Sequence, residues 1–297
     1  MPGQLVCGIE NLAGDVRPLA VARSLSERLG LRLVTVHVTE PGADPVAEAA
    51  ARRLAEQAAD AYVTQPADAL VEYGDPVERL TAAAAEADAE LLVVGSRGSG
   101  SLKTALLGSV STGVTATAPC PVVVVSRGAA EQGPRRGVEP EPAHSLVSGV
   151  DGSEDSYAGA ALASDLAVRL RLRLLLVHVM PGEGGSVPVE YSSLLASDER
   201  SALNVLHRAA AAVSHRITPE VRLERGDPAD RLDDLAGRES AELIVVGSRG
   251  LGKLRAALLG SVAARLAGTA CVPVTVLSPH VQLAAGSGDY ELREVVL

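Results

Sequence analysis

The chain contains one glycine-rich signature twice, and this duplication constrains its fold more than any other feature of the sequence. The spacing G-x-x-G-x9-G-S begins at Gly95 and again at Gly247, an offset of 152 residues. The residues around the signature repeat as well, because GSRG and ALLGSV occur in both copies. Agreement that extends into the flanks is not a chance match, so we infer that one domain is present twice.

The repeat runs through both halves of the 297-residue chain. Near the start of each half the offset is 141 residues, so the second half carries about 11 extra residues, which we place within 181–200. We expect two domains of ordinary size, residues 1–126 and 145–280. Residues 127–144 are rich in Pro, Gly and charge and are predicted to be a linker, and residues 281–297 a C-terminal tail.

Each half alternates short apolar runs with longer amphipathic segments. In the first half, five apolar runs begin near residues 5, 31, 69, 91 and 121, and a helix is expected from about 45 to 64. Such alternation is typical of βαβ units, whose parallel sheet is covered by helices on both faces. The sequence therefore predicts an α/β fold with two tandem doubly wound domains, each built on a five-stranded parallel sheet.

Two repeated features have a structural interpretation. Asp75 and Asp227 each precede a proline, so we predict that they are N-caps with Pro at the first helical position. His37 and His178 lie in the second strand of each copy. We expect both to be hydrogen-bonded within the sheet rather than catalytic.

Charge and composition argue against several classes of function. The net charge is −10, and both halves are acidic, whereas nucleic acid or an anionic membrane would require a basic face. The apolar runs are far shorter than the roughly 20 residues that cross a bilayer, and no signal peptide is recognised, so we expect a cytoplasmic protein. The 3 cysteines include no C-x-x-C pair, which predicts a reducing compartment and no metal cluster.

The glycine signature is suited to holding phosphate. Backbone N–H groups converge on an anion where glycines permit close approach and where a helix N-terminus presents unpaired donors. Ser109 and Ser261 begin the following helix, where each can cap the helix or bind phosphate, and Arg97 and Arg249 either pair with phosphate or point to solvent. The spacing fits neither a Walker A loop nor the dinucleotide pattern G-x-G-x-x-G. The structural alternative is a glycine-rich turn before an ordinary helix.

The tip of the first strand should form the other wall of the site. In the second half it presents Asp151, a carboxylate that can accept a hydrogen bond from a base amino group or a ribose hydroxyl. The first half carries three replacements there: Glu10 for Asp151, Leu12 for Ser153 and Asp15 for Ser156. We therefore expect the second half to bind more tightly.

Together these features resemble the universal stress protein family in its tandem two-domain form. The glycine signature resembles the ATP-binding motif of that family, and the resemblance covers nearly all of both repeats. It implies the strand order 3-2-1-4-5, which brings the tips of strands one and four together at the switch point where ligands bind. It also implies that strand five pairs antiparallel with another strand five, so an intrachain pseudo-dimer and a homodimer of chains are expected.

The resemblance implies that the ligand is ATP, with AMP or ADP as alternatives and Mg²⁺ carried with ATP. We predict neither catalytic residues nor protein ligands to a metal. The resemblance implies the following binding residues in the second half, to which we add Arg249 from the chemistry of its side chain: Val150, Asp151, Val179, Gly247, Gly250, Gly260, Ser261 and Val262. Those of the first half are Ile9, Glu10, Val38, Gly95, Arg97, Gly98, Gly108, Ser109, Val110 and Ser111. Ser111 is expected to extend the phosphate cap, whereas the second half has Ala263 at that position.

The resemblance also implies the function, which is regulation during stress, in which nucleotide occupancy alters association with an unidentified protein. The alternatives are a slow ATP-hydrolysing enzyme of the α-hydrolase type and a nucleotide-free scaffold. No Asp or Glu occurs between residues 95 and 118 or between 247 and 269. Hydrolysis needs a positioned base and usually a metal held by carboxylates, so any turnover should be slow.

Overall fold

The structure is a computed structural model that describes residues 3–10, 15–39, 53, 68–97, 107–129, 144–182, 185–187, 197–250, 259–278 and 281. The first half contains β1 (Gln4–Ile9), α1 (Arg17–Leu29), β2 (Arg32–Thr39), β3 (Asp68–Tyr73), α3 (Pro76–Glu86), β4 (Ala89–Gly95), α4 (Ser109–Thr117) and β5 (Val122–Val125). Apart from Arg53, the helix expected near 45–64 lies outside the described residues.

Among the described residues, the second half repeats this order with two additional elements, strand β8 and helix α6. Its elements are β6 (Ser145–Gly149), α5 (Glu154–Leu170), β7 (Arg173–Met180), β8 (Gly185–Val187), α6 (Ser197–Val213), β9 (Glu220–Arg225), α7 (Pro228–Arg238), β10 (Ala241–Gly247), α8 (Ser261–Thr269) and β11 (Val274–Leu277). Strand β8 was not predicted from the sequence. It lies within 181–200, where the extra residues were placed, and pairs antiparallel with β9. The exact domain boundaries, the linker and the tail stay predictions.

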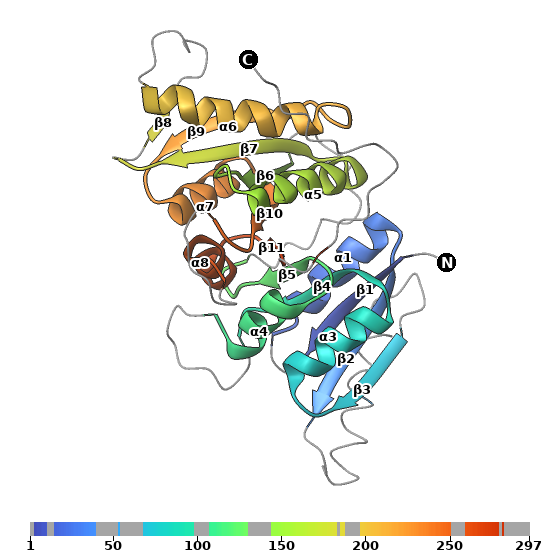
Figure 1. Cartoon of the computed structure of the whole chain (residues 1–297). Coiled ribbons are helices and arrows are strands. Elements are labelled where there is room, and N and C mark those ends of the chain that lie inside the picture. The colour runs from blue at the N-terminus through green and yellow to red at the C-terminus, as the bar shows by residue number, and fades with distance from the viewer. Residues whose placement is uncertain are drawn as a thin grey trace.

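The strands form one sheet in the order β3-β2-β1-β4-β5-β11-β10-β6-β7-β9-β8 (Figure 1). In each half, five parallel strands follow the order 3-2-1-4-5, which confirms the predicted fold class. One hydrophobic cluster joins α1, α5 and α6 to one face of the sheet and runs through both halves. Separate clusters under α3 and α4 and under α7 and α8 cover the other face, so both faces are packed.

The two halves join through β5 and β11, which pair antiparallel with Val274 opposite Val124 and Val276 opposite Val122. These four side chains are fully buried. The pairing of fifth strands therefore occurs within the chain, as the resemblance implied for one of its two arrangements. A homodimer of whole chains stays a prediction.

Ion pairs across this junction are reciprocal. Arg28 of α1 binds Glu242 in β10, and Arg169 of α5 binds Glu90 in β4, the latter at 2.8 Å. Arg28 and Arg169 are related by the early offset of the repeat, and Glu90 and Glu242 by the later one. Each half thus gives and receives the same contact, which is the mark of a two-fold, isologous interface.

The repeated Asp and His residues have the structural roles predicted for them. Asp75 accepts hydrogen bonds from the first-turn N–H groups of α3, and Asp227 does the same for α7, with Pro at the start of each helix. His37 donates from Nδ1 to Ile9 O at 3.0 Å. The corresponding bond from His178 to Val150 O is 2.7 Å long. The caps fix where each helix begins beside the strand ends.

Candidate functional site

A cavity of about 320 Å³ lies at the carboxyl ends of β6, β7 and β10, against the starts of α7 and α8. These strand ends are the expected ligand position in a doubly wound sheet, because strand order reverses there. All the residues predicted for the second half line the cavity: Val150, Asp151, Val179, Gly247, Arg249, Gly250, Gly260, Ser261 and Val262.

One wall of the cavity is aliphatic. Val177 and Val179 of β7, Leu232 of α7, Val246 of β10 and Leu259 line it. Since none of the described residues that line the cavity is Phe, Tyr or Trp, a flat ring there would lie between branched aliphatic side chains rather than stack on an aromatic face.

The start of α8 forms the polar end of the cavity. Its N-cap is Gly260, which makes no side-chain hydrogen bond to the helix, so Ser261 is the first helical residue rather than the cap. Gly260 N donates to Ser248 O at 2.7 Å, whereas the next three N–H groups, of residues 261–263, have no partner within the helix. Unpaired donors at the positive end of a helix dipole make a cradle for an anion.

The glycines let the loop after β10 lie close to its neighbours. A methyl group on Gly247 would lie 2.8 Å from the backbone carbon of Asp155, and one on Gly250 would collide with the carboxylate of Asp151. A methyl group on Gly260 would lie 3.2 Å from Ser248 O. These approaches press the loop against the tip of β6 and the first turn of α5, which shapes the cavity.

The turn after β6 is held by hydrogen bonds. One carboxylate oxygen of Asp151 accepts from Ser153 N at 2.9 Å and from Ser153 Oγ at 2.6 Å. Ser156 Oγ accepts from Asp151 N at 3.3 Å and from Gly152 N at 3.2 Å, where Gly152 has a φ of 94°. Ser156 also lines the cavity, although the sequence analysis did not include it. Its one sequence signal was the replacement by Asp15 in the first half.

Asp155 is a second residue that the sequence analysis missed. It stands in the first turn of α5, and its Oδ2 accepts from Ser248 Oγ at 3.0 Å. The same oxygen lies 4.0 Å from Nε of Arg249, whose side chain is half-exposed at the cavity. Nothing in the spacing of the sequence indicated that the start of α5 touches the glycine loop.

The first half arranges the corresponding backbone in the same way. Helix α4 also begins after a glycine N-cap, Gly108, without a side-chain cap, and Gly108 N donates to Ser96 O at 2.8 Å. The remaining residues predicted there lie at the same places in the repeat: Ile9 and Glu10 at the tip of β1, Val38 near the end of β2, Gly95 at the end of β4, and Ser109 and Val110 in the first turn of α4. Gly98 lies outside the described residues.

Two side chains of the first half are used differently from the prediction. Ser111 is buried and donates its hydroxyl to Gly95 O at 2.6 Å, so its proton is not available to a phosphate, and the expected extension of the phosphate cap is corrected. Arg97 donates to Gly268 O of the second half at 3.4 Å rather than pointing to solvent. Glu10 is exposed at the strand tip.

The described residues include no cluster of three or more His, Cys, Asp or Glu side chains able to hold a metal ion. Burial raises the pKa of the Cys7 and Cys120 thiols to about 12. Burial, together with Asp233, raises the pKa of Cys271 to about 12 as well. Each described thiol is therefore protonated at neutral pH and is a poor nucleophile. None of the described helices is both long and apolar enough to span a membrane.

Comparisons with known proteins agree with this geometry. The sequence profile described as the universal stress protein family matches residues 3–126 and 143–278. A universal stress protein of Mycolicibacterium smegmatis is 34% identical over 204 residues, which cover 66% of this chain and 64% of that protein. One of Mycobacterium tuberculosis is 35% identical over 194 residues, 64% of this chain and 62% of that protein. The matches thus span less than two thirds of these relatives.

Solved structures share the fold over nearly the whole chain. A universal stress protein from Archaeoglobus fulgidus DSM 4304 superimposes with a TM-score of 0.65 at 19% identity, covering 93% of this chain and 98% of that one. A functionally unknown protein from Pseudomonas aeruginosa PAO1 gives a TM-score of 0.61 at 17% identity, covering 93% of each chain. Identity this low is informative about the fold alone.

Proposed function

The chain belongs to the universal stress protein family, and we propose that it is a regulatory protein that binds ATP in the cavity of its second half. One observation carries this proposal: the predicted residues of that half converge on one cavity, beside a helix start whose N–H groups lack an intrahelical partner. An acidic chain gains affinity for a polyphosphate only where such donors converge, because its net charge repels the ligand.

Within this proposal, the phosphates lie on the N–H groups at the start of α8, with Arg249 at the edge of the loop. The base lies against Val150 and Val179, and the carboxylate of Asp151 accepts from the ribose or the base. Shorter nucleotides, AMP or ADP, would leave part of the cradle unused. Mg²⁺ would be bound by the phosphates and water, since the glycine-loop segment supplies no carboxylate.

The same residues favour binding over turnover. The two carboxylates nearest the loop are already hydrogen-bonded, Asp151 to Ser153 and Asp155 to Ser248. His178 lines the cavity, but its Nδ1 is used on Val150 O. Hydrolysis would need a base positioned on a water beside the γ-phosphate. We therefore propose that occupancy of the site, rather than hydrolysis, alters association with a regulated protein.

Two measurements on the purified protein test the proposal. Mass spectrometry of small molecules released by denaturation should detect an adenine nucleotide, and calorimetry should show ATP binding. Gly260→Asp places an anion in the cradle of α8 and should weaken binding by at least about thirtyfold, which is roughly 2 kcal/mol.

Gly108→Asp makes the same change at the matching position of the first half and is the control. It should leave the tighter of the bound nucleotides in place. Absence of both copurified nucleotide and ATP binding would refute the proposed function, and a larger loss from Gly108→Asp would assign the tighter site to the first half.

A further inference from the structure

Helix α8 belongs to the second half but contacts the first half at its carboxyl end. Its first turn begins the phosphate cradle of the second half, whereas the carbonyl groups at its other end face the first half. Ser126, which follows β5, donates from Oγ to Ala270 O at 2.5 Å. Arg97, in the glycine loop of the first half, donates to Gly268 O at 3.4 Å. Two segments of the first half therefore hold the carboxyl end of a helix that belongs to the second.

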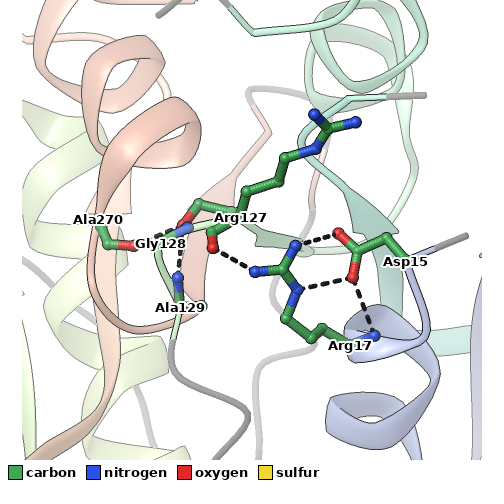
Figure 2. A network of polar contacts seen from close by, with 7 residues as sticks. Asp15, Arg17, Arg127, Gly128, Ala129 and Ala270 are labelled. Atoms are coloured by element: carbon green, nitrogen blue, oxygen red, sulfur yellow. Dashed lines mark hydrogen bonds and ion pairs between the residues drawn. The ribbon is translucent and has the colours of Figure 1, made fainter. Parts of the chain in front are cut away.

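The Ser126 hydroxyl uses its full hydrogen-bonding capacity. It also accepts from Gly128 N at 3.0 Å and from Ala129 N at 2.9 Å, the backbone that leaves β5 (Figure 2). Ser126 is fully buried, and Ala129 is buried in the core cluster shared by the halves. A methyl group on Gly128 would lie 3.0 Å from Thr269 O, so the backbone passes close to the helix end. Residues 126–129 are therefore held against the end of α8 by hydrogen bonds and close backbone packing.

The strand-one turn of the first half is tied into the same junction. Asp15 accepts from Arg17 N at 3.1 Å and from its Nε at 2.7 Å, and Arg17 donates to Arg127 O (Figure 2). The matching residue of the second half, Ser156, instead binds the turn beside its own cavity. The first half thus uses this position at the junction between the halves.

Arg97 supplies a positive charge at the carboxyl end of α8, whose last turn has no basic residue. The end of a helix carries partial negative charge and unpaired carbonyl groups. The counterpart of Arg97, Arg249, lies 4.0 Å from Asp155 of its own half. The two arginines of the repeated loop therefore differ in function: one faces its own cavity, and the other stabilises the far end of the helix that forms it.

We propose that the first half positions α8, and through it the phosphate cradle of the second half, with Arg97 and Ser126 as the positioning residues. Helix α8 has 9 residues, little more than two turns, so its first-turn donors move with the end that is anchored. An anion bound by the glycine loop of the first half competes with Gly268 O for Arg97. Occupancy of the first half therefore weakens binding in the second, and by linkage the reverse also holds.

The binding part of this proposal rests on the proposed function, so its test uses two readouts. Arg97→Gln and Ser126→Ala are each made in the otherwise unchanged chain, because an aspartate at Gly108 would itself place an anion beside Arg97. Calorimetry measures ATP affinity, and hydrogen exchange without nucleotide measures protection of the amides of residues 264–270. We expect each variant to bind ATP about two- to fivefold more weakly and to exchange faster in α8. Arg97→Lys keeps the positive charge and should behave like the parent protein in both measurements.

The matched control is Arg127→Gln, because Arg127 joins the network through its main-chain carbonyl, which the variant keeps. It should change neither readout. Unchanged exchange and affinity in Arg97→Gln would overturn the proposal, as would faster exchange with unchanged affinity, since α8 would then be anchored without controlling the cradle. If the parent protein binds no nucleotide, the proposed function fails, and the exchange data alone decide whether Arg97 holds α8. Arg97→Gln remains decisive if Ser126→Ala does not fold.

Discussion

Ser156 and Asp15 occupy the same position of the repeat, yet they act in different places. Ser156 binds the backbone of the turn beside the second-half cavity, whereas Asp15 binds Arg17 at the junction between the halves. The glycine-loop arginines differ in the same sense, because Arg249 lines the cavity and Arg97 reaches Gly268 O. At both positions, the first half directs to the junction a side chain that the second half keeps at its site.

The junction itself shows the opposite pattern. The ion pairs of Arg28 and Arg169 are reciprocal, and two of the three facing pairs of β5 and β11 are valines, with Thr275 opposite Val123 between them. A two-fold contact requires the same residues on both sides, so the halves must agree there. Among the described residues, the strand ends of the two halves do not contact each other in this way, so their residues are free to differ. One repeat therefore provides both a symmetric junction and two strand-end regions whose side chains differ in their contacts.

The largest predicted effect tests the symmetric junction between β5 and β11. Val124→Lys and Val276→Lys place a charge at matching, fully buried positions of β5 and β11. Each should lower the free energy of unfolding by about 3–5 kcal/mol, and by similar amounts, because a buried unpaired charge is strongly destabilising. Urea unfolding followed by circular dichroism measures this.

Leu70→Lys is the control, since Leu70 is 40% exposed on the edge strand β3 and should tolerate lysine with little change. Two separate unfolding transitions, with one half unaffected by the lysine in the other, would contradict a shared junction.

The symmetric part was also the more predictable from sequence. Alternating apolar runs gave the fold class, because buried parallel strands read as continuous apolar segments, and the offsets of the repeat gave the two domains. The strand order came from the family resemblance. The short edge strand β8 was missed, since three residues carry no periodic signal. The predicted pairing of fifth strands came from the family resemblance, and their apolar sequences without internal charge are compatible with it.

The second predicted effect tests the asymmetric part. Asp151→Ala should weaken ATP binding by about tenfold, roughly 1.4 kcal/mol, through loss of a charged acceptor and of the turn held by Ser153. The matching change in the first half, Glu10→Ala, should alter the affinity less than twofold, because Glu10 is exposed at its strand tip. Calorimetry on both variants provides the measurement. A larger loss from Glu10→Ala would reverse the ranking of the halves.

Sequence reasoning found the cavity of the second half but not all of its contacts. The spacing of the glycines predicted the backbone donors, and the family resemblance supplied the residues at the strand tips; all the residues predicted for this half line one cavity. Ser156 and Asp155 were not predicted, because their roles depend on how α5 packs against the loop after β10. The use of Arg97 was not predictable for the same reason: its partner, Gly268 O, lies 171 residues away and offers only a backbone carbonyl.

The smallest predicted effect concerns the caps of α3 and α7, which adjoin the two sites. Asp75→Ala should lower the free energy of unfolding by about 1 kcal/mol, the usual cost of losing an N-cap. Asp227→Ala should cost more, because Asp227 also binds Arg265 of α8 at 2.8 Å, whereas the first half has Gly113 at the place of Arg265. Chemical denaturation of the two variants compares them directly.

Arg265→Gln decides whether that ion pair explains the difference between the two caps. In its background Asp227→Ala should cost no more than Asp75→Ala, since only the cap remains to be lost. Gly113 fits this interpretation, because a methyl group there would lie 2.6 Å from Val77, so α4 packs against α3 too closely for an arginine to enter. If the difference persisted without Arg265, the extra stability would have to come from the apolar packing of α7 against α8, where Leu232 and Val262 line the cavity. The asymmetry between the halves would then lie in the cavity wall rather than at its rim.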